Sequence, residues 1–243
     1  MRAGCGHAGT IVAPRPRLLV HDRGVEREIV DAKSELRLRV RRGRSSRIGS
    51  GAVPRGGAAA HALLDAARAA GLLDPQGRPG VVGPTVVAAY LAMPGEPDPG
   101  LLCAAVRAQG GSVLLPVPEP GRSLRWAMDD GTRGTAAAPV RVPVPTGPVI
   151  GTGAVVLLDH GVRVLFIPAL SVDGSGRRLG QGGGYYDRLL TDLAAARRSG
   201  VATPRVVAVV HDDELLEGDR IPIEEHDEPV DAALTPSGLW SLG

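Results

Sequence analysis

Two continuous apolar runs constrain the fold of this chain more than any other feature. Residues 162–167 and 206–210 show no polar alternation, which is typical of strands buried on both faces of a parallel sheet. Between them, a glycine-rich segment precedes a helical pattern over residues 185–198, which ends before Gly200. A strand, a helix and a strand in this order predict a right-handed crossover. We therefore expect an α/β, three-layer fold with a mostly parallel central sheet flanked by helices.

The rest of the 243-residue chain favours the same class. The hydrophobic content is 43% but the aromatic content only 2%, so the core must consist of Val, Leu, Ile and Ala. Apolar periodicity predicts a helix over residues 25–42, through Val25, Ile29, Ala32, Leu36 and Val40. Helices are also expected over 58–70 and 98–109, and strands over 81–90 and 112–117.

Residues 1–24 mix Gly, Pro and Arg without apolar periodicity, and we expect a disordered extension there. Residues 25–243 are expected to form a single α/β domain, with 43–57 as a linker within it. No apolar run approaches the ~20 residues that a membrane span needs. The two cysteines, Cys5 and Cys103, are too few for a disulfide framework or a thiolate zinc site. These features predict a cytoplasmic monomer that does not bind a membrane.

The N-terminal part is strongly basic. Residues 37–47 contain six arginines, which indicates either an anion-binding helix or a nucleic-acid patch. Lys33 is the only lysine of the chain and lies one helical turn before Arg37, so both would share a helix face. Lys33 and Arg37 could bind adjacent phosphate groups, or they could be ordinary solvated charges on the helix surface.

A glycine-rich segment between Arg177 and Arg188 is the most informative for function. Four glycines in five positions directly before a helix can turn backbone N–H groups toward a bound anion. The alternative is a flexible loop without a ligand. The dinucleotide fingerprint would require a third glycine where Tyr185 stands, so that class of site is not expected. Two tyrosines, flanking arginines and an acid in the first helical turn favour a nucleotide triphosphate with Mg²⁺.

These residues resemble a known family. Together with residues 167–173, the run Arg178-Leu179-Gly180-Gln181-Gly182-Gly183-Gly184-Tyr185-Tyr186-Asp187-Arg188 resembles the signature of the 5-formyltetrahydrofolate cyclo-ligases, also called methenyltetrahydrofolate synthetases. Three further segments agree in order: Lys33 with Leu36 and Arg37, residues 90–98, and residues 222–227. The resemblance covers about residues 30–236. Val144 and Arg163 depart from the family pattern.

The resemblance implies ATP- and Mg-dependent conversion of 5-formyltetrahydrofolate to 5,10-methenyltetrahydrofolate, with release of ADP and phosphate. It implies ATP contacts from Lys33, Arg37, Arg178, Leu179, Gly180, Gln181, Gly182, Gly183, Gly184, Tyr185 and Tyr186. Folate contacts are implied for Leu91, Glu96, Gln181, Gly182, Gly183, Gly184 and Tyr185, and Mg²⁺ binding for Asp187 and Asp227. It assigns no catalytic residue.

Two other interpretations compete with this one. The chain could be a non-catalytic nucleic-acid-binding or regulatory relative that uses the basic segment from Arg37 to Arg47, or another Mg²⁺-nucleotide enzyme that shares only the loop. Aromatic residues for base stacking are absent from the basic segment, and the remaining chain is acidic. We therefore expect a small-molecule folate substrate and no nucleic acid. Taken one by one, Glu96 and Asp227 could be surface acids, and Tyr185 or Tyr186 could belong to the hydrophobic core.

Overall fold

The computed structural model describes residues 23–49, 57–73, 85–119, 123–135, 143–218, 221–224 and 227–242. Its helices are α1 (Arg23–Gly49), α2 (Ala58–Ala69), α3 (Gly100–Ala108), α4 (Gly153–Asp159), α5 (Tyr185–Arg198) and the 3-10 helix η1 (Asp212–Glu214). Its strands are β1 (Val86–Ala88), β2 (Ser112–Pro118), β3 (Leu124–Met128), β4 (Arg133–Thr135), β5 (Pro143–Pro145), β6 (Val149–Thr152), β7 (Val164–Pro168), β8 (Ser171–Asp173), β9 (Arg178–Leu179), β10 (Arg205–Val209), β11 (Leu215–Leu216), β12 (Ala232–Thr235) and β13 (Gly238–Ser241).

The main sheet has eight strands in the order β13-β12-β10-β7-β1-β2-β3-β6. Its five central strands, from β12 to β2, pair in parallel, and the pairs beyond them are antiparallel. Strand β8 pairs with β9 and β11 in a smaller sheet, and β4 pairs with β5. The expected α/β fold with a mostly parallel sheet is confirmed.

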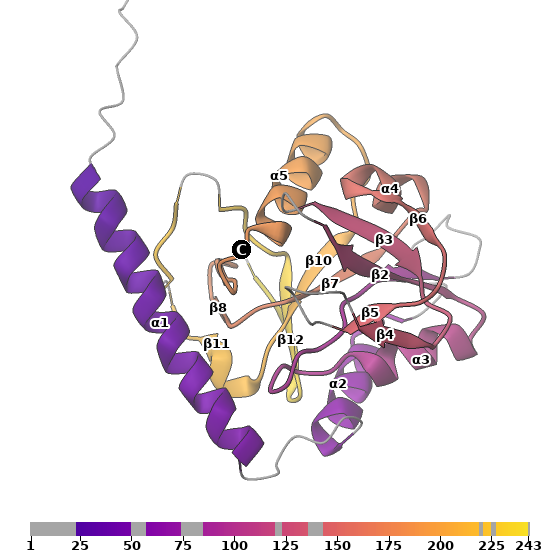
Figure 1. Cartoon of the computed structure of the whole chain (residues 1–243), viewed down its shortest axis with the longest axis horizontal. Coiled ribbons are helices and arrows are strands. Elements are labelled where there is room, and N and C mark those ends of the chain that lie inside the picture. The colour runs from indigo at the N-terminus through magenta and orange to yellow at the C-terminus, as the bar shows by residue number, and fades with distance from the viewer. Residues whose placement is uncertain are drawn as a thin grey trace, which may run out of the picture.

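Helices cover both faces of the main sheet (Figure 1). Leu165 and Ile167 of β7 pack with the buried leucines of α5 on one face, whereas Phe166 between them packs with α2 and α3 on the other. This alternation explains why the strand is apolar at every position: both of its faces are buried. The core follows the composition, because of its largest fully buried side chains only Trp126 and Phe166 are aromatic.

Helix α1 lies beside these layers, next to the edge that carries β8 and β11 (Figure 1). It extends to Gly49, so the predicted linker over residues 43–57 is wrong in its first seven residues. The reason is tertiary: Arg44 and Arg47 form ion pairs with the domain, and these contacts stabilise helical turns that Gly43 and two serines do not favour by themselves.

The predicted apolar stripe of this helix is also partly wrong. Ala32 is exposed, whereas Lys33 is only 5% exposed and Leu36 is buried. The extension predicted over residues 1–24 lies outside the described residues up to position 22, and positions 23 and 24 belong to α1. None of the helices in the described part of the chain offers an apolar run long enough for a transmembrane segment.

The remaining elements agree closely with the sequence analysis. Helix α5 has the predicted bounds, and α2, α3, β2, β7 and β10 differ from theirs by one or two residues at the ends. Strand β1 covers only Val86–Ala88 of the predicted 81–90, of which residues 81–84 lie outside the described ranges.

Candidate active site

The glycine loop, residues 180–184, connects β9 to the first turn of α5. Gly182 and Gly184 have φ angles of +95° and +70°, which lie in the left-handed region that favours glycine. Gly184 is the N-cap residue of α5, which begins at Tyr185. The glycines therefore give the loop a specific bent shape at a helix N-terminus, as the phosphate-cradle interpretation requires.

This loop lines two cavities. The first, of about 240 Å³, is mostly apolar, and its walls are Tyr90, Leu91, Met93, Glu96, Pro116, Leu124, Pro143, Pro168, Arg178, Tyr185, Tyr186, Asp187 and the loop. The second, of about 460 Å³, is mostly polar and is lined by Lys33, Arg37, Arg178, Leu179, Asp187, Arg188, Thr191, Asp192, Glu224, Asp227 and three glycines of the loop. The same loop thus forms part of the wall of both an apolar and a charged cavity.

Every site residue predicted from the sequence lines at least one of these cavities. Lys33, Arg37 and Asp227 line the polar cavity although they come from opposite ends of the chain. Of the residues expected to contact ATP, four line only the apolar cavity: Gln181, Gly183, Tyr185 and Tyr186. His226, which directly precedes Asp227 in the chain, lies outside the described residues.

Several charges of the polar cavity form ion pairs with one another. The Lys33 ammonium lies 2.5 Å from Oδ2 of Asp227 and 3.4 Å from Oε2 of Glu224. Arg178 forms an ion pair with Asp187. Arg37 donates from Nε to the carbonyl oxygen of Gly180 at 3.0 Å, which fixes α1 against the loop. The site therefore holds cations and acids within reach of the same ligand.

These residues fit a magnesium ion that arrives with phosphate. Within the described ranges, no three His, Cys, Asp or Glu side chains are close enough together to hold a metal ion by themselves. Mg²⁺ commonly binds through one or two carboxylates, with substrate phosphates and water completing its octahedron. Asp187 and Asp227 both line the polar cavity, and their carboxylate oxygens are ligands of the kind that Mg²⁺ prefers.

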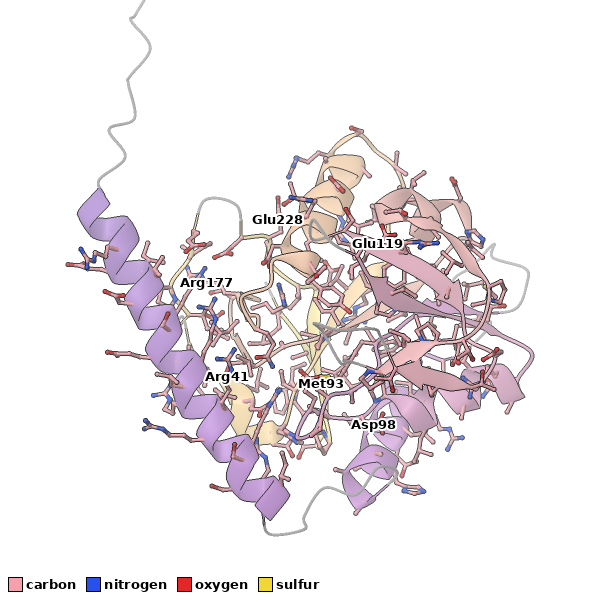
Figure 2. All side chains as sticks on the ribbon, in the orientation of Figure 1. Arg41, Met93, Asp98, Glu119, Arg177 and Glu228 are labelled. Carbon is pink, nitrogen blue, oxygen red and sulfur yellow. The ribbon has the colours of Figure 1, made fainter. Side chains whose placement is uncertain are left out.

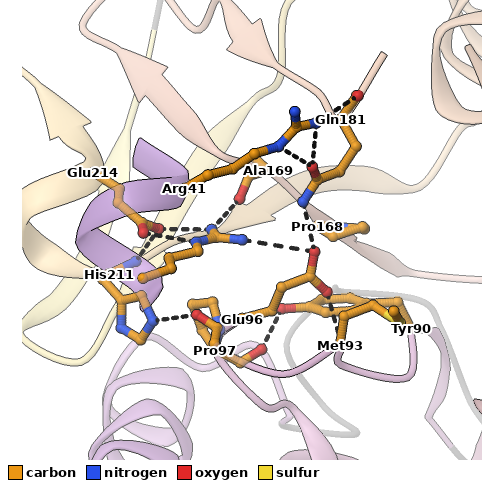
Figure 3. Close-up of polar contacts among 12 residues, drawn as sticks. Arg41, Tyr90, Met93, Glu96, Pro97, Pro168, Ala169, Gln181, His211 and Glu214 are labelled. Carbon is orange, nitrogen blue, oxygen red and sulfur yellow. Dashed lines mark hydrogen bonds and ion pairs between the residues drawn. The ribbon is translucent and has the colours of Figure 1, made fainter. Parts of the chain in front are cut away.

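The apolar cavity contains one buried acid. Glu96 is 7% exposed; its Oε2 accepts from the Met93 backbone N–H at 3.0 Å, and its Oε1 accepts from Nε2 of Gln181 at 3.3 Å (Figure 3). Burial raises the pKa of Tyr186, and the negative charge of Glu96 adds to this effect. The Arg178 guanidinium lies 5.9 Å from the centre of the Tyr186 ring. An apolar pocket with tyrosine walls and one acid suits a flat heterocycle with N–H donors.

Tyr90 forms a second buried tyrosine contact in this wall. Its hydroxyl donates to the Pro97 carbonyl oxygen at 2.5 Å, and burial raises its pKa well above the ordinary range. The turn that carries Glu96 is thereby tied to β1 and the core. Glu96 is therefore not the exposed surface acid that its Pro- and Gly-rich surroundings allow.

The basic segment turns toward the domain, a direction that we did not predict from its composition. Four of its six arginines contact the domain: Arg37, Arg41, Arg44 and Arg47. Their spacing of four, three and three residues was a readable signal, because it places them on one helical face. The inward contacts leave Arg39 and Arg42 exposed, which weakens the interpretation of this segment as a nucleic-acid surface.

The chain is similar to known proteins. Residues 80–236 match the model of the 5-formyltetrahydrofolate cyclo-ligase family. A 5-formyltetrahydrofolate cyclo-ligase of Mycolicibacterium smegmatis is 38% identical over 163 residues, which are 64% of this chain and 76% of that protein. The Escherichia coli protein of the same name is 31% identical over 67% of this chain and 84% of its own length. Lys33 and Arg37 precede the matched residues, so their placement depends on the geometry described above.

Two solved structures have a similar fold. The NMR structure of Aquifex aeolicus 5,10-methenyltetrahydrofolate synthetase superposes with a TM-score of 0.59 at 22% identity, over 86% of this chain and 92% of the other. The Mycoplasma pneumoniae 5,10-methenyltetrahydrofolate synthetase gives 0.54 at 15% identity, over 83% and 97%. At these identities the likeness concerns the fold.

Proposed function

Because the chain belongs to the 5-formyltetrahydrofolate cyclo-ligase family, we propose that the two cavities beside its glycine loop hold the two substrates of that reaction. The protein is an ATP-dependent ligase of one-carbon folate metabolism, and it converts 5-formyltetrahydrofolate to 5,10-methenyltetrahydrofolate. The observation that carries the proposal is the loop itself, which lines both an apolar and a charged cavity.

The triphosphate of ATP is assigned to the polar cavity. Lys33 and Arg37 line this cavity from α1 and Arg178 from β9, so positive charges reach it from separate elements. The backbone N–H groups of the loop and the N-terminal end of α5 add partial positive charge there. ATP binding then exchanges partners: Lys33 turns from Asp227 to a phosphate, and Arg178 turns from Asp187.

Once Lys33 and Arg178 bind the phosphates, the carboxylates of Asp187 and Asp227 are available to bind Mg²⁺. When bound, Mg²⁺ neutralises phosphate charge that the protein's cations leave uncovered. The ion pairs of the free site hold both carboxylates near the cavity, so they do not have to be recruited from elsewhere. Asp227 also accepts from the Glu224 backbone N–H at 2.8 Å, which orients its carboxylate.

The pterin ring of the folate is assigned to the apolar cavity. Tyr185, Tyr186 and Leu91 provide flat apolar walls, and the Glu96 carboxylate can accept hydrogen bonds from ring N–H groups. The ring should lie beside the loop, because three of the loop glycines line both cavities. This placement brings the N5 formyl group toward the terminal phosphate.

The chemistry then depends mainly on positioning. The formyl oxygen attacks the γ-phosphorus, a new O–P bond forms, and the bond from this phosphorus to the oxygen of ADP breaks. N10 of the folate attacks the activated carbon and loses its proton to solvent, and the oxygen leaves with phosphate. Aligning two bound reactants and balancing the phosphate charge are the tasks that the loop and its cations can perform.

The test is direct. Purified protein is mixed with 5-formyltetrahydrofolate and Mg-ATP, and the absorbance of the methenyl product and the release of ADP are followed together. We expect both to appear in equal amounts. Folded protein that binds ATP but forms neither product would contradict the assignment.

Two expectations stay predictions beside this proposal: a monomeric state and a cytoplasmic location. Sedimentation at several concentrations would check the first. Among the relatives, the Arabidopsis thaliana protein is named as mitochondrial. We do not propose a nucleic-acid-binding role, because the arginines it would use mostly contact the domain.

A further inference from the structure

Helix α1 contacts the domain mainly through charged side chains. Its buried apolar contact is Leu36, which packs in a small cluster with Leu170, Leu179 and Ile221. Toward its C-terminal end, the contacts are made by Arg41, Arg44 and Arg47, which we call the arginine ladder. Arg41 reaches from α1 toward the domain in Figure 2. Through Gln181 and Glu96, the ladder contacts residues that line the apolar cavity.

Arg44 is the most enclosed member of the ladder, at 5% exposed. Its Nε and Nη2 donate to the two carboxylate oxygens of Glu214, each at 2.8 Å, and Nη2 also donates to the Ala169 carbonyl at 2.6 Å. Its Nη1 lies 3.6 Å from Oε1 of Glu96, and it finds no hydrogen-bond partner among the described residues. The rigid guanidinium group is thus held on one side and faces Glu96 with the other.

Glu214 is itself fixed, so it can hold Arg44 in place. Its Oε2 accepts from the His211 backbone N–H at 3.1 Å, and its Oε1 accepts from Arg47 at 2.6 Å. The His211 ring lies 3.1 Å from the Gly95 carbonyl oxygen, beside Glu96 in the chain. Helix α1, η1 and the turn that carries Glu96 therefore form one connected polar network (Figure 3).

Arg41 acts on the same carboxylate through Gln181. Its Nε and Nη2 donate to Oε1 of Gln181 at 3.2 and 3.0 Å, and Nη2 also donates to the Gln181 carbonyl at 3.1 Å. Because Oε1 is occupied by Arg41, the amide nitrogen of Gln181 is turned toward Glu96. The Glu96 carboxylate is thus approached by Gln181, Arg44 and the Met93 backbone.

We propose that Arg41 and Arg44 are positioning residues that fix the Glu96 carboxylate for the folate substrate. The inference rests on the proposed function, which places Glu96 against the pterin ring. A glutamate that must be immobilised on binding lowers the affinity for its ligand by about two- to tenfold, and a network that fixes it beforehand removes this loss. Neither arginine lines either of the two cavities beside the loop, so both act through other residues.

Three single variants and one control test the proposal in the full-length protein. Arg41→Met removes the contact to Gln181 from an exposed side chain, so folding should be retained. Arg44→Lys keeps a buried cation but cannot bind Glu214 and face Glu96 with one planar group. Glu96→Gln removes the positioned charge itself. Arg42→Met is the control, because Arg42 is exposed on the same helix and the charge change is the same as in Arg41→Met.

For each variant, KM and kcat for 5-formyltetrahydrofolate, the calorimetric Kd for ATP, and Tm are measured. We expect Arg41→Met and Arg44→Lys to raise the folate KM about three- to tenfold. The Kd for ATP should change by less than about twofold, and Arg42→Met should match the wild type. In a Glu96→Gln background, Arg41→Met should have no further effect on KM, because Arg41 acts through Glu96.

Three results would overturn the inference. If Glu96→Gln raises KM but Arg41→Met and Arg44→Lys do not, positioning is wrong while the proposed function stands. If the effects of Arg41→Met and Glu96→Gln multiply in the double variant, Arg41 acts independently of Glu96. If Glu96→Gln itself leaves KM unchanged, the folate placement fails and the inference fails with it. Should Arg44→Lys not fold, Arg41→Met decides between these outcomes.

Discussion

Replacing Lys33 with methionine should alter the binding of ATP and of Mg²⁺ in opposite directions. Lys33 is buried, and its ammonium group lies 2.5 Å from Asp227 and 3.4 Å from Glu224. Methionine keeps the length of the stem and removes the charge. A charge-assisted hydrogen bond to phosphate contributes about 1.5–3 kcal/mol, so the affinity for ATP should fall by about tenfold to a hundredfold.

The same substitution leaves Asp227 and Glu224 without their ammonium partner. The side chains of these acids are 22% and 28% exposed, so water can partly replace the lysine. We therefore expect a loss of only about 1–2 kcal/mol in the free energy of unfolding, which corresponds to about 2–8 °C in Tm for a domain of this size. With the repelling cation gone, the affinity for Mg²⁺ without nucleotide should rise about three- to tenfold.

Isothermal titration calorimetry with ATP, with Mg²⁺ and with Mg-ATP measures all three affinities, and Arg39→Met is the matched control, because Arg39 is exposed on the same helix. Lys33→Arg should restore part of the ATP affinity, because it restores the charge. Unchanged ATP binding in Lys33→Met, or Mg²⁺ binding that weakens, would refute the assignment of Lys33 to the phosphates and of Asp227 to the metal.

The remaining predictions concern other parts of the site and the core. Asp187→Asn and Asp227→Asn should each reduce turnover at least tenfold while Tm changes by a few degrees at most, and a Mg²⁺ titration of the rate should reveal a raised requirement. Gly182→Ala should destabilise the loop by about 1–2 kcal/mol, because φ there is +95°, and weaken ATP binding measurably in the same calorimetric assay. Burial raises the pKa of the Cys103 thiol to about 12 from 9.0, so only the unfolded chain loses that proton between these values. The neutral thiol therefore contributes fully to the free energy of unfolding below pH 9, and above pH 9 that free energy falls by ~1.4 kcal/mol per pH unit. Urea titrations of Cys103→Ala at several pH values should show a shallower decline in the free energy of unfolding than the wild type. Deleting residues 1–22 should leave Tm and activity nearly unchanged, because their sequence has no apolar periodicity.

The sequence by itself determined the layers and the loop. Residues 162–167 are apolar at every position because a strand covered on both faces has no side that prefers water, and that pattern is local and readable. The bounds of α5 were equally readable, since the glycines before it and Gly200 after it are local backbone signals. The resemblance carried by residues 178–188 predicted a site at the loop, and this loop lines both cavities.

Only the tertiary structure decided which charges meet. Lys33 and Asp227 are 194 positions apart in the chain, and no local pattern records their contact. The helix was predicted to end near residue 42 because Gly43 and the serines after it are weak helix formers, yet Arg44 and Arg47 find acids on η1 and hold the next turns together. Helix propensity is worth tenths of a kilocalorie per residue, and enclosed ion pairs outweigh it. Local sequence patterns do not encode long-range electrostatic contacts of this kind. These contacts hold α1 beside both cavities.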